Sequence, residues 1–210
     1  MPGSTDAFIH RVGEELRTPL TIATGMLQVY RRRHPLDDGD SGYLLDRGEA
    51  ALDRLAVLVE DLVLVSRLAS GVHVPSQQPV AARSLLLDVA ARAAEPRQVR
   101  VDCDPQLVLR TDPVLLGRAV AALVDNALVH AGGTEVVAQA GAVEVCDRGP
   151  GLPADVLARL HAAGAAAGSA VVGPGVGLDL VRVLADHLGA TLTVRSDPGA
   201  GTAVRLALPA

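Results

Sequence analysis

The stretch VGEELRTPLT, residues 12–21, lies inside the pattern that decides the first half of the fold. Apolar residues recur at spacings of three and four from about residue 5 to residue 33, which predicts one long amphipathic helix. Ser4 or Thr5 is suited to cap its first turn. Pro19 stands in mid-helix, where a proline costs about 3 kcal/mol. The apolar stripe consists of Phe8, Val12, Leu16, Pro19, Ala23, Leu27 and Tyr30.

Glu14 lies on the polar side of this helix. At about 100° per residue it projects away from the apolar stripe, and His10, Arg17 and Thr21 share its side. Judged from periodicity alone, these polar residues form an ordinary solvent-exposed helix face. The costly Pro19, about one turn beyond Glu14, favours a functional reason for this polar cluster.

A second helix is predicted from about residue 43 to residue 69, after the break RRRHPLDDGDSG. Its stripe consists of Leu52, Leu55, Val59, Leu62 and Val65 or Ser66. The short break makes the two helices an antiparallel hairpin. A hairpin with one stripe per helix cannot bury both stripes alone. We therefore expect residues 1–70 to dimerise into a four-helix bundle.

The pattern changes after a linker at residues 71–79. From residue 80 to residue 210, helical and strand-like segments alternate, which predicts an α/β layer domain with helices on one face of a mixed sheet. Expected helices lie near 83–94, 113–130 and 178–188, and expected strands near 98–103, 134–139, 142–146 and on both sides of DPGAGT. The fold class is thus a helical hairpin followed by an α/β domain.

Composition excludes several functions. The formal net charge is −5, and all 19 basic residues are arginine, which argues against a nucleic-acid surface and against the lysine of a P-loop. The six histidines show no paired ligand spacing, and Cys103 and Cys146 are expected to be reduced thiols rather than a disulfide or metal site. We found no stretch suited to a membrane span, so we expect this segment to be cytoplasmic and without membrane contact, although a longer parent protein could be anchored.

ELRTPLT, with Phe8 upstream, resembles the H-box of the sensor histidine kinases of two-component systems, which usually reads F…SHELRTPLT. Gly13 matches the serine position and Glu14 the phospho-accepting histidine. The resemblance implies that Glu15 assists phosphoryl transfer. It also implies that Thr18 helps position water for dephosphorylation of a response regulator.

The second half carries four further motifs in the order found in this family. LVDNALVHA (123–131) resembles the N-box, DRGPG (147–151) the G1 box, GPGVGL (173–178) the G2 box, and GAGT (199–202) the last glycine motif. The resemblance covers nearly the whole chain and implies an α/β-sandwich (Bergerat, or GHKL) domain that binds ATP.

The resemblance also assigns roles in the nucleotide site. Asn126 matches the Mg²⁺ ligand, and Asp147 matches the carboxylate that binds the adenine amino group. The implied nucleotide-site residues are Asn126, His130, Asp147, Gly149, Gly151, Gly173, Gly175, Gly177, Leu178 and Thr202. Ala122 and Val129 depart from the usual Asn and basic residue, and the lid is short and free of aromatic residues. We therefore expect weak ATP binding.

These features predict a homodimeric histidine kinase core that binds ATP and Mg²⁺ and acts on a response regulator. A carboxylate at position 14 should abolish autophosphorylation, whether Glu14 is natural or an engineered replacement. The alternative is a degenerate pseudokinase or a phosphatase-only regulator. His10 is a weaker substitute acceptor because it lacks an acidic neighbour. A GHKL relative such as an anti-sigma kinase or a gyrase-type ATPase is disfavoured by the hairpin at residues 1–70.

Overall fold

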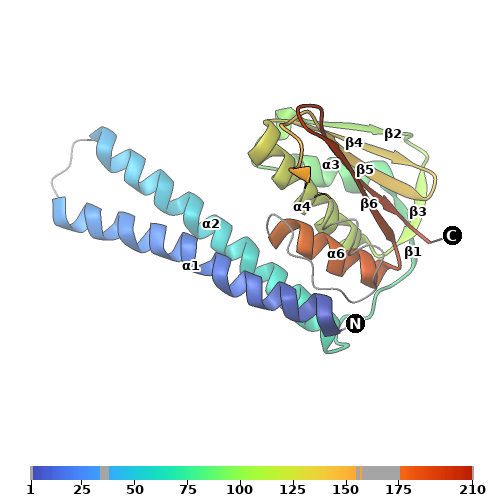
Figure 1. Ribbon diagram of the computed structural model, residues 1–210, viewed down its shortest axis with the longest axis horizontal. Helices are drawn as coiled ribbons and strands as arrows, with labels where there is room; N and C mark the ends of the chain where they lie inside the picture. The colour runs from blue at the N-terminus through green and yellow to red at the C-terminus, as the bar shows by residue number, and fades with distance from the viewer. Residues whose placement is uncertain (1, 34–37, 155–156, 158–175, 210) are drawn as a thin grey trace.

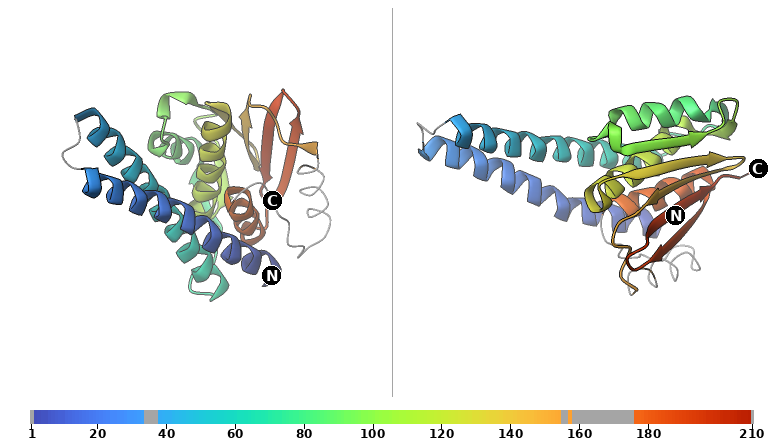
Figure 2. Two further views of the ribbon diagram at one scale, coloured as in Figure 1. Left: turned by 60° about the vertical axis from the view of Figure 1, so that its left-hand side comes forward. Right: turned by 90° about the horizontal axis from the view of Figure 1, so that it is seen from above.

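The computed structural model describes residues 2–33, 38–154, 157 and 176–209. It has two parts, a long helical hairpin and an α/β domain (Figure 1). The α/β domain packs beside the N-terminal half of α1 and the C-terminal half of α2, and the other halves of these helices project away from it (Figures 1 and 2). The predicted fold class is confirmed.

The hairpin consists of α1, Pro2–Arg33, and α2, Asp38–Ala69. α1 remains helical through Pro19, whose missing N–H leaves the carbonyl of Glu15 without its usual partner inside the helix. Phe8 and Val12 of α1 are fully buried, as is Val65 of α2, because they join the core of the α/β domain. The hairpin and the α/β domain therefore share one hydrophobic core.

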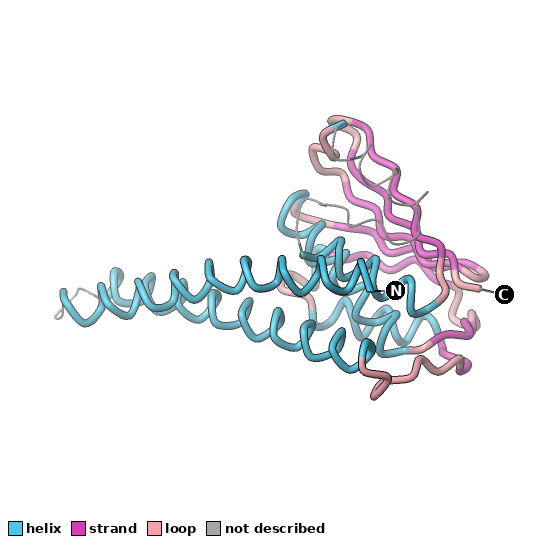
Figure 3. Tube along the Cα trace, turned by 60° about the horizontal axis from the view of Figure 1, so that its bottom comes forward, coloured by secondary structure: helices cyan, strands magenta, loops and turns pink. Residues whose placement is uncertain are grey.

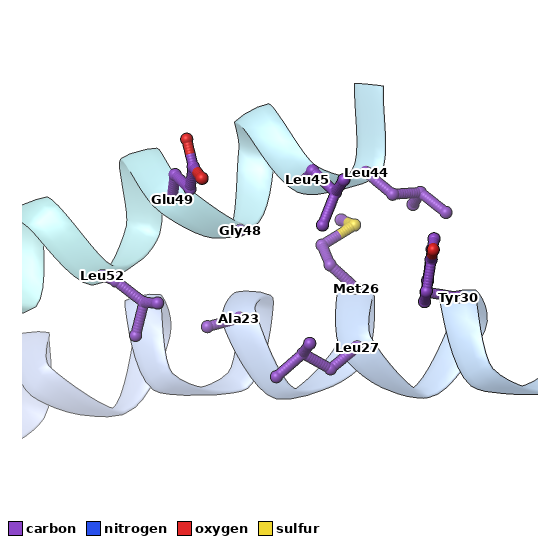
Figure 4. A pocket seen from close by; sticks show the side chains of 9 residues that line it. All are labelled: Ala23, Met26, Leu27, Tyr30, Leu44, Leu45, Gly48, Glu49 and Leu52. Atoms are coloured by element: carbon purple, nitrogen blue, oxygen red, sulfur yellow. The ribbon is translucent and has the colours of Figure 1, made fainter. Parts of the chain in front are cut away.

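The projecting half of the hairpin exposes much of its predicted apolar stripe. Leu27 is 55 % exposed and Leu52 is 52 % exposed, although both were expected to face the inside of a bundle. A small apolar pocket of about 90 Å³ lies between α1 and α2 in this half (Figure 4). Its lining residues are Ala23, Met26, Leu27, Tyr30, Leu44, Leu45, Gly48, Glu49 and Leu52. One chain alone leaves this surface uncovered.

The α/β domain contains a five-stranded mixed sheet among the described residues, in the order β2-β4-β5-β7-β6. β2 and β4 are parallel and the other neighbours are antiparallel. The elements are β1 (Gln78–Ala81), α3 (Ala82–Arg92), the 3₁₀ helix η1 (Pro96–Gln98), β2 (Val99–Cys103), β3 (Val108–Thr111), α4 (Pro113–Ala131), β4 (Thr134–Gln139), β5 (Ala142–Asp147), α6 (Val176–Leu188), β6 (Thr191–Asp197) and β7 (Gly201–Ala207).

Helices α3, α4 and α6 cover one face of this sheet (Figure 3). The strands alternate accordingly: Val143 and Val145 of β5 are buried, whereas Glu144 between them points to the uncovered face. There Glu144 accepts a hydrogen bond from Arg195 at 2.5 Å and lies 3.7 Å from Arg205. The uncovered face is thus a charged, solvated surface.

Local signals at both ends define α4, the helix that carries the stretch resembling the N-box. Asp112 caps it by accepting hydrogen bonds from the N–H groups of Val114 (2.9 Å) and Leu115 (3.1 Å), and Pro113 occupies the first turn. Gly132 ends it in a left-handed conformation, at φ 70°. By length and composition α4 would suffice to cross a membrane, but eight of its apolar residues are buried inside the domain.

Two short strands were not predicted. β1 starts at Gln78, inside the range expected to be a linker, and pairs antiparallel with β3 in a separate two-stranded sheet. Both strands have only four residues, and β1 has no buried residue. A run this short carries no readable alternation, so sequence periodicity could not reveal it.

Candidate functional site

A cleft of about 530 Å³ lies between the hairpin and the α/β domain. The hairpin contributes Glu15, Thr18, Arg54, Val57, Leu58 and Asp61, α4 contributes Arg118, Ala122, Asp125, Asn126, Val129 and His130, and α6 contributes Val176 and Gly177. Residues that are more than 100 positions apart in the sequence therefore line one space. The cleft is large enough for a small-molecule ligand.

The predicted site residues divide into those that reach this cleft and those that do not. Glu15 and Thr18 from the H-box-like stretch line it together with Asn126, His130 and Gly177. Glu14 is exposed on α1 and is not among the described lining residues. Because successive helical residues differ by about 100°, Glu14 lies beside the cleft-facing side of α1 rather than on it.

Asp147 organises a second cluster at the end of β5. Its Oδ1 atom accepts hydrogen bonds from the backbone N–H groups of Gly149 (2.8 Å) and Thr202 (3.2 Å). Gly201 has φ +94°, and a Cβ atom there would lie 2.0 Å from the carbonyl oxygen of Asp147. Gly151 has φ +75°, and a Cβ atom there would lie 2.4 Å from a backbone oxygen. These two positions thus require glycine, because the backbone approaches too closely for any side chain.

Ser196 of β6 is a member of this cluster that sequence reasoning missed. Its hydroxyl accepts a hydrogen bond from Leu152 N–H at 2.8 Å, donates to the carbonyl of Gly201 at 3.0 Å, and lies 3.0 Å from the Thr202 hydroxyl. It therefore ties the loop after β5 to the start of β7. A single serine in a strand gives no sequence signal for this role.

One described residue of the predicted site, Leu178, lies in neither group. Leu178 is buried in the core of the domain, at 6 % exposure. Gly173 and Gly175 lie outside the described residues.

The start of α6 contacts the H-box-like part of α1 directly. The Glu15 carboxylate accepts a hydrogen bond from the N–H of Val176 at 3.0 Å, and Arg11 forms a 2.8 Å ion pair with Asp179. Glu15 also lies 3.4 Å from Arg54 of α2. The acidic residue next to Glu14 is thus engaged by the first residue of α6.

A buried ion pair joins α2 to α4. Arg118 donates two hydrogen bonds to the Asp61 carboxylate, at 2.5 and 2.8 Å, and lies 4.0 Å from Asp125. Burial raises the pKa of Asp61 above its ordinary value, although Arg118 acts in the opposite direction. Burial likewise raises the pKa of Asp125. Neither Asp61 nor Arg118 was predicted, because their partners are 57 positions apart.

The donor set is compatible with Mg²⁺ held beside phosphates. Within the described ranges, no group of three or more His, Cys, Asp or Glu side chains could hold a metal ion alone. Mg²⁺ keeps several waters and needs only one or two protein oxygens when phosphates supply the rest. The amide oxygen of Asn126, which lines the cleft, fits that requirement.

Comparison with known families defines the class. Residues 5–71 match the His Kinase A (phospho-acceptor) domain, and residues 111–210 match the histidine kinase-, DNA gyrase B- and HSP90-like ATPases. This chain therefore belongs to the histidine kinases, and it holds their phospho-acceptor hairpin and their ATPase domain.

Individual relatives agree with this assignment. The chain is 32 % identical to the probable sensor histidine kinase TcrY of Mycobacterium tuberculosis, over 96 % of this chain and 45 % of that protein. It is 30 % identical to the sensor protein KdpD of Mycobacterium tuberculosis, over 97 % of this chain and 26 % of that protein. The chain thus spans less than half the length of these two relatives.

Solved structures share the fold. The Acinetobacter baumannii histidine kinase AdeS superposes with a TM-score of 0.67 at 19 % identity, covering 93 % of this chain and 98 % of that one. Full-length ShkA in complex with AMPPNP superposes with a TM-score of 0.58 at 25 % identity, covering 94 % of this chain and 45 % of that one.

Proposed function

We propose that this chain is the catalytic core of a bacterial two-component sensor histidine kinase that binds ATP with Mg²⁺ and acts on the receiver domain of a response regulator. One observation carries the proposal. Asn126 and His130 of the ATPase domain line the same cleft as Glu15 and Thr18 of the phospho-acceptor hairpin. A nucleotide held at the N-box would therefore lie beside the H-box helix.

The chain's own residues divide the work of nucleotide binding. Asn126 would hold Mg²⁺, which neutralises phosphate charge when it is bound. The Asp147 carboxylate, oriented by the Gly149 and Thr202 N–H groups, would accept a hydrogen bond from the adenine amino group. We include Gly151, Gly173, Gly175, Gly177 and Leu178 in the nucleotide site by their match to the family motifs.

Glu14 makes this copy silent as an autokinase. A carboxylate cannot form the phosphoramidate that an imidazole forms, and its negative charge repels the approaching phosphate. Thr18 nevertheless lines the cleft. That observation favours, as a second candidate, a regulator that binds nucleotide and a response regulator without transferring phosphate, or that acts only as a phosphatase.

Replacing Glu14 tests the two candidates. With labelled ATP we expect no acid-labile, base-stable phosphate on the chain as it stands, and label on the Glu14→His variant. Glu14→Gln is the matched control and should stay unlabelled. Phosphate label on the unsubstituted chain would refute the proposal that Glu14 abolishes autophosphorylation. A silent Glu14→His variant that still binds ATP would favour the non-kinase candidate.

The remaining assignments follow from the same proposal. Residues 1–70 form the dimerisation and phospho-acceptor domain, 71–79 the linker and 80–210 the ATP-binding domain, in a segment that we place in the cytoplasm. The exposed Leu27 and Leu52 support dimerisation, because a second hairpin would cover them.

A further inference from the structure

Arg54 of α2 is a cation in the cleft that no family motif assigns. Its Nη2 atom lies 3.4 Å from Oε2 of Glu15, while Oε1 of the same carboxylate accepts the Val176 N–H at 3.0 Å. One anionic group therefore bridges the hairpin and the ATPase domain, at the edge of the space that Asn126 also lines.

Of the cations that line the cleft among the described residues, Arg54 is the one whose present ion pair is weak enough to be replaced by a ligand. The chain contains no lysine, and Val129 replaces the basic residue usual in the N-box. Among the described lining residues, the two guanidinium groups belong to Arg54 and Arg118. Arg118 is held by two short hydrogen bonds to Asp61 and is 22 % exposed. The Arg54 side chain is 62 % exposed, and an exposed pair at 3.4 Å is weak.

We propose that Arg54 binds the terminal phosphate of ATP, and that the Glu15 carboxylate competes with this phosphate for Arg54. A phosphate presents more charge than a carboxylate and matches the planar guanidinium in a two-pronged contact. The inference rests on the proposed ATP site.

This competition gives the hairpin a means of distinguishing nucleotides. ADP lacks the terminal phosphate and leaves the Arg54–Glu15 contact intact. ATP draws Arg54 away from Glu15, whose carboxylate keeps the hydrogen bond from the Val176 N–H. Arg54 is a specificity residue in this scheme, because it acts on ATP and not on ADP.

Nucleotide binding to the full chain tests the proposal. Dissociation constants for ATP and for ADP are measured with Mg²⁺ by calorimetry for the unsubstituted chain, Arg54→Gln and Glu15→Ala. Arg47→Gln is the control, an exposed arginine on the same helix outside the cleft. Far-UV circular dichroism verifies that each variant is folded.

The two variants should change ATP affinity in opposite directions. Arg54→Gln should weaken ATP binding about fivefold, which is the scale of one exposed ion pair. Glu15→Ala should strengthen ATP binding about threefold by removing the competitor. ADP affinity should change less than about twofold in both variants, as should both affinities in Arg47→Gln.

Three results would overturn the inference. An unchanged ratio of ATP to ADP affinity in Arg54→Gln would remove Arg54 from the phosphate site while leaving the proposed function standing. Weaker ATP binding in Glu15→Ala would exclude competition. Failure of the unsubstituted chain to bind either nucleotide would refute the proposed function, and this inference with it.

Discussion

Removing Arg118 tests whether the cost of burying the Asp61 charge, more than the attraction between Asp61 and Arg118, determines how this ion pair affects the free energy of unfolding. The Asp61 side chain is 4 % exposed and receives both of its side-chain hydrogen bonds from Arg118. Arg118→Leu would leave this carboxylate buried without its cation. Because breaking one side of a buried pair costs about 3–5 kcal/mol, and Arg118 itself is 22 % exposed, we expect a loss of about 3 kcal/mol at about pH 8.

The loss should shrink at lower pH. Burial already raises the pKa of Asp61 above 3.8, and Arg118 is the group that opposes this rise, so the pKa climbs further in Arg118→Leu. A group whose pKa is higher in the folded state binds its proton more tightly there. The contribution of Asp61 to the stability of Arg118→Leu should therefore be fully present below the ordinary carboxyl pKa and be lost as the pH rises through the folded pKa.

The reciprocal variant should behave differently. Asp61→Leu leaves Arg118, which keeps 22 % exposure and Asp125 at 4.0 Å, so we expect a loss of only about 1–2 kcal/mol. The double variant should recover most of the Arg118→Leu loss, because two apolar side chains can replace a buried ion pair.

Urea unfolding followed by circular dichroism, at one protein concentration and at about pH 5 and about pH 8, measures all three variants. Arg47→Leu, on an exposed part of α2, is the control for a lost surface arginine. Equal losses for Arg118→Leu and Asp61→Leu, with no dependence on pH, would refute the reasoning.

Two further predictions concern the nucleotide site and the dimer. Gly201→Ala should abolish ATP binding, because its Cβ would lie 2.0 Å from the Asp147 carbonyl oxygen. Gly199→Ala, at φ +78° in open space, should lower the free energy of unfolding by about 1–2 kcal/mol and retain ATP binding. Calorimetry and thermal unfolding compare the two variants, and equal ATP binding would contradict the role of the close approach. Leu52→Glu should convert the proposed dimer to a monomer, as measured by light scattering. The control Leu87→Glu, on α3 and 47 % exposed, should stay dimeric. A dimeric Leu52→Glu variant would show that this surface is not the dimer interface.

Local sequence patterns were sufficient to predict most of the secondary structure. The helix expected at 113–130 is observed at Pro113–Ala131, because Asp112 and Gly132 mark its ends within the sequence itself. The hairpin likewise followed from apolar spacing alone. The four-residue strands β1 and β3 were not predicted, because neither is long enough to show a repeating pattern of apolar residues.

The two glutamates of VGEELRTPLT separate what each level of structure decided. The sequence by itself indicated that they lie on an amphipathic helix of a histidine kinase hairpin, and its resemblance to the H-box predicts that Glu14 stands at the histidine position. Only the tertiary structure decided that Glu15 meets Val176 and Arg54, and that Asp61 and Arg118 pair across the two domains. Helix periodicity depends on neighbours three and four residues apart. These contacts depend on how two finished domains pack, which no short stretch encodes.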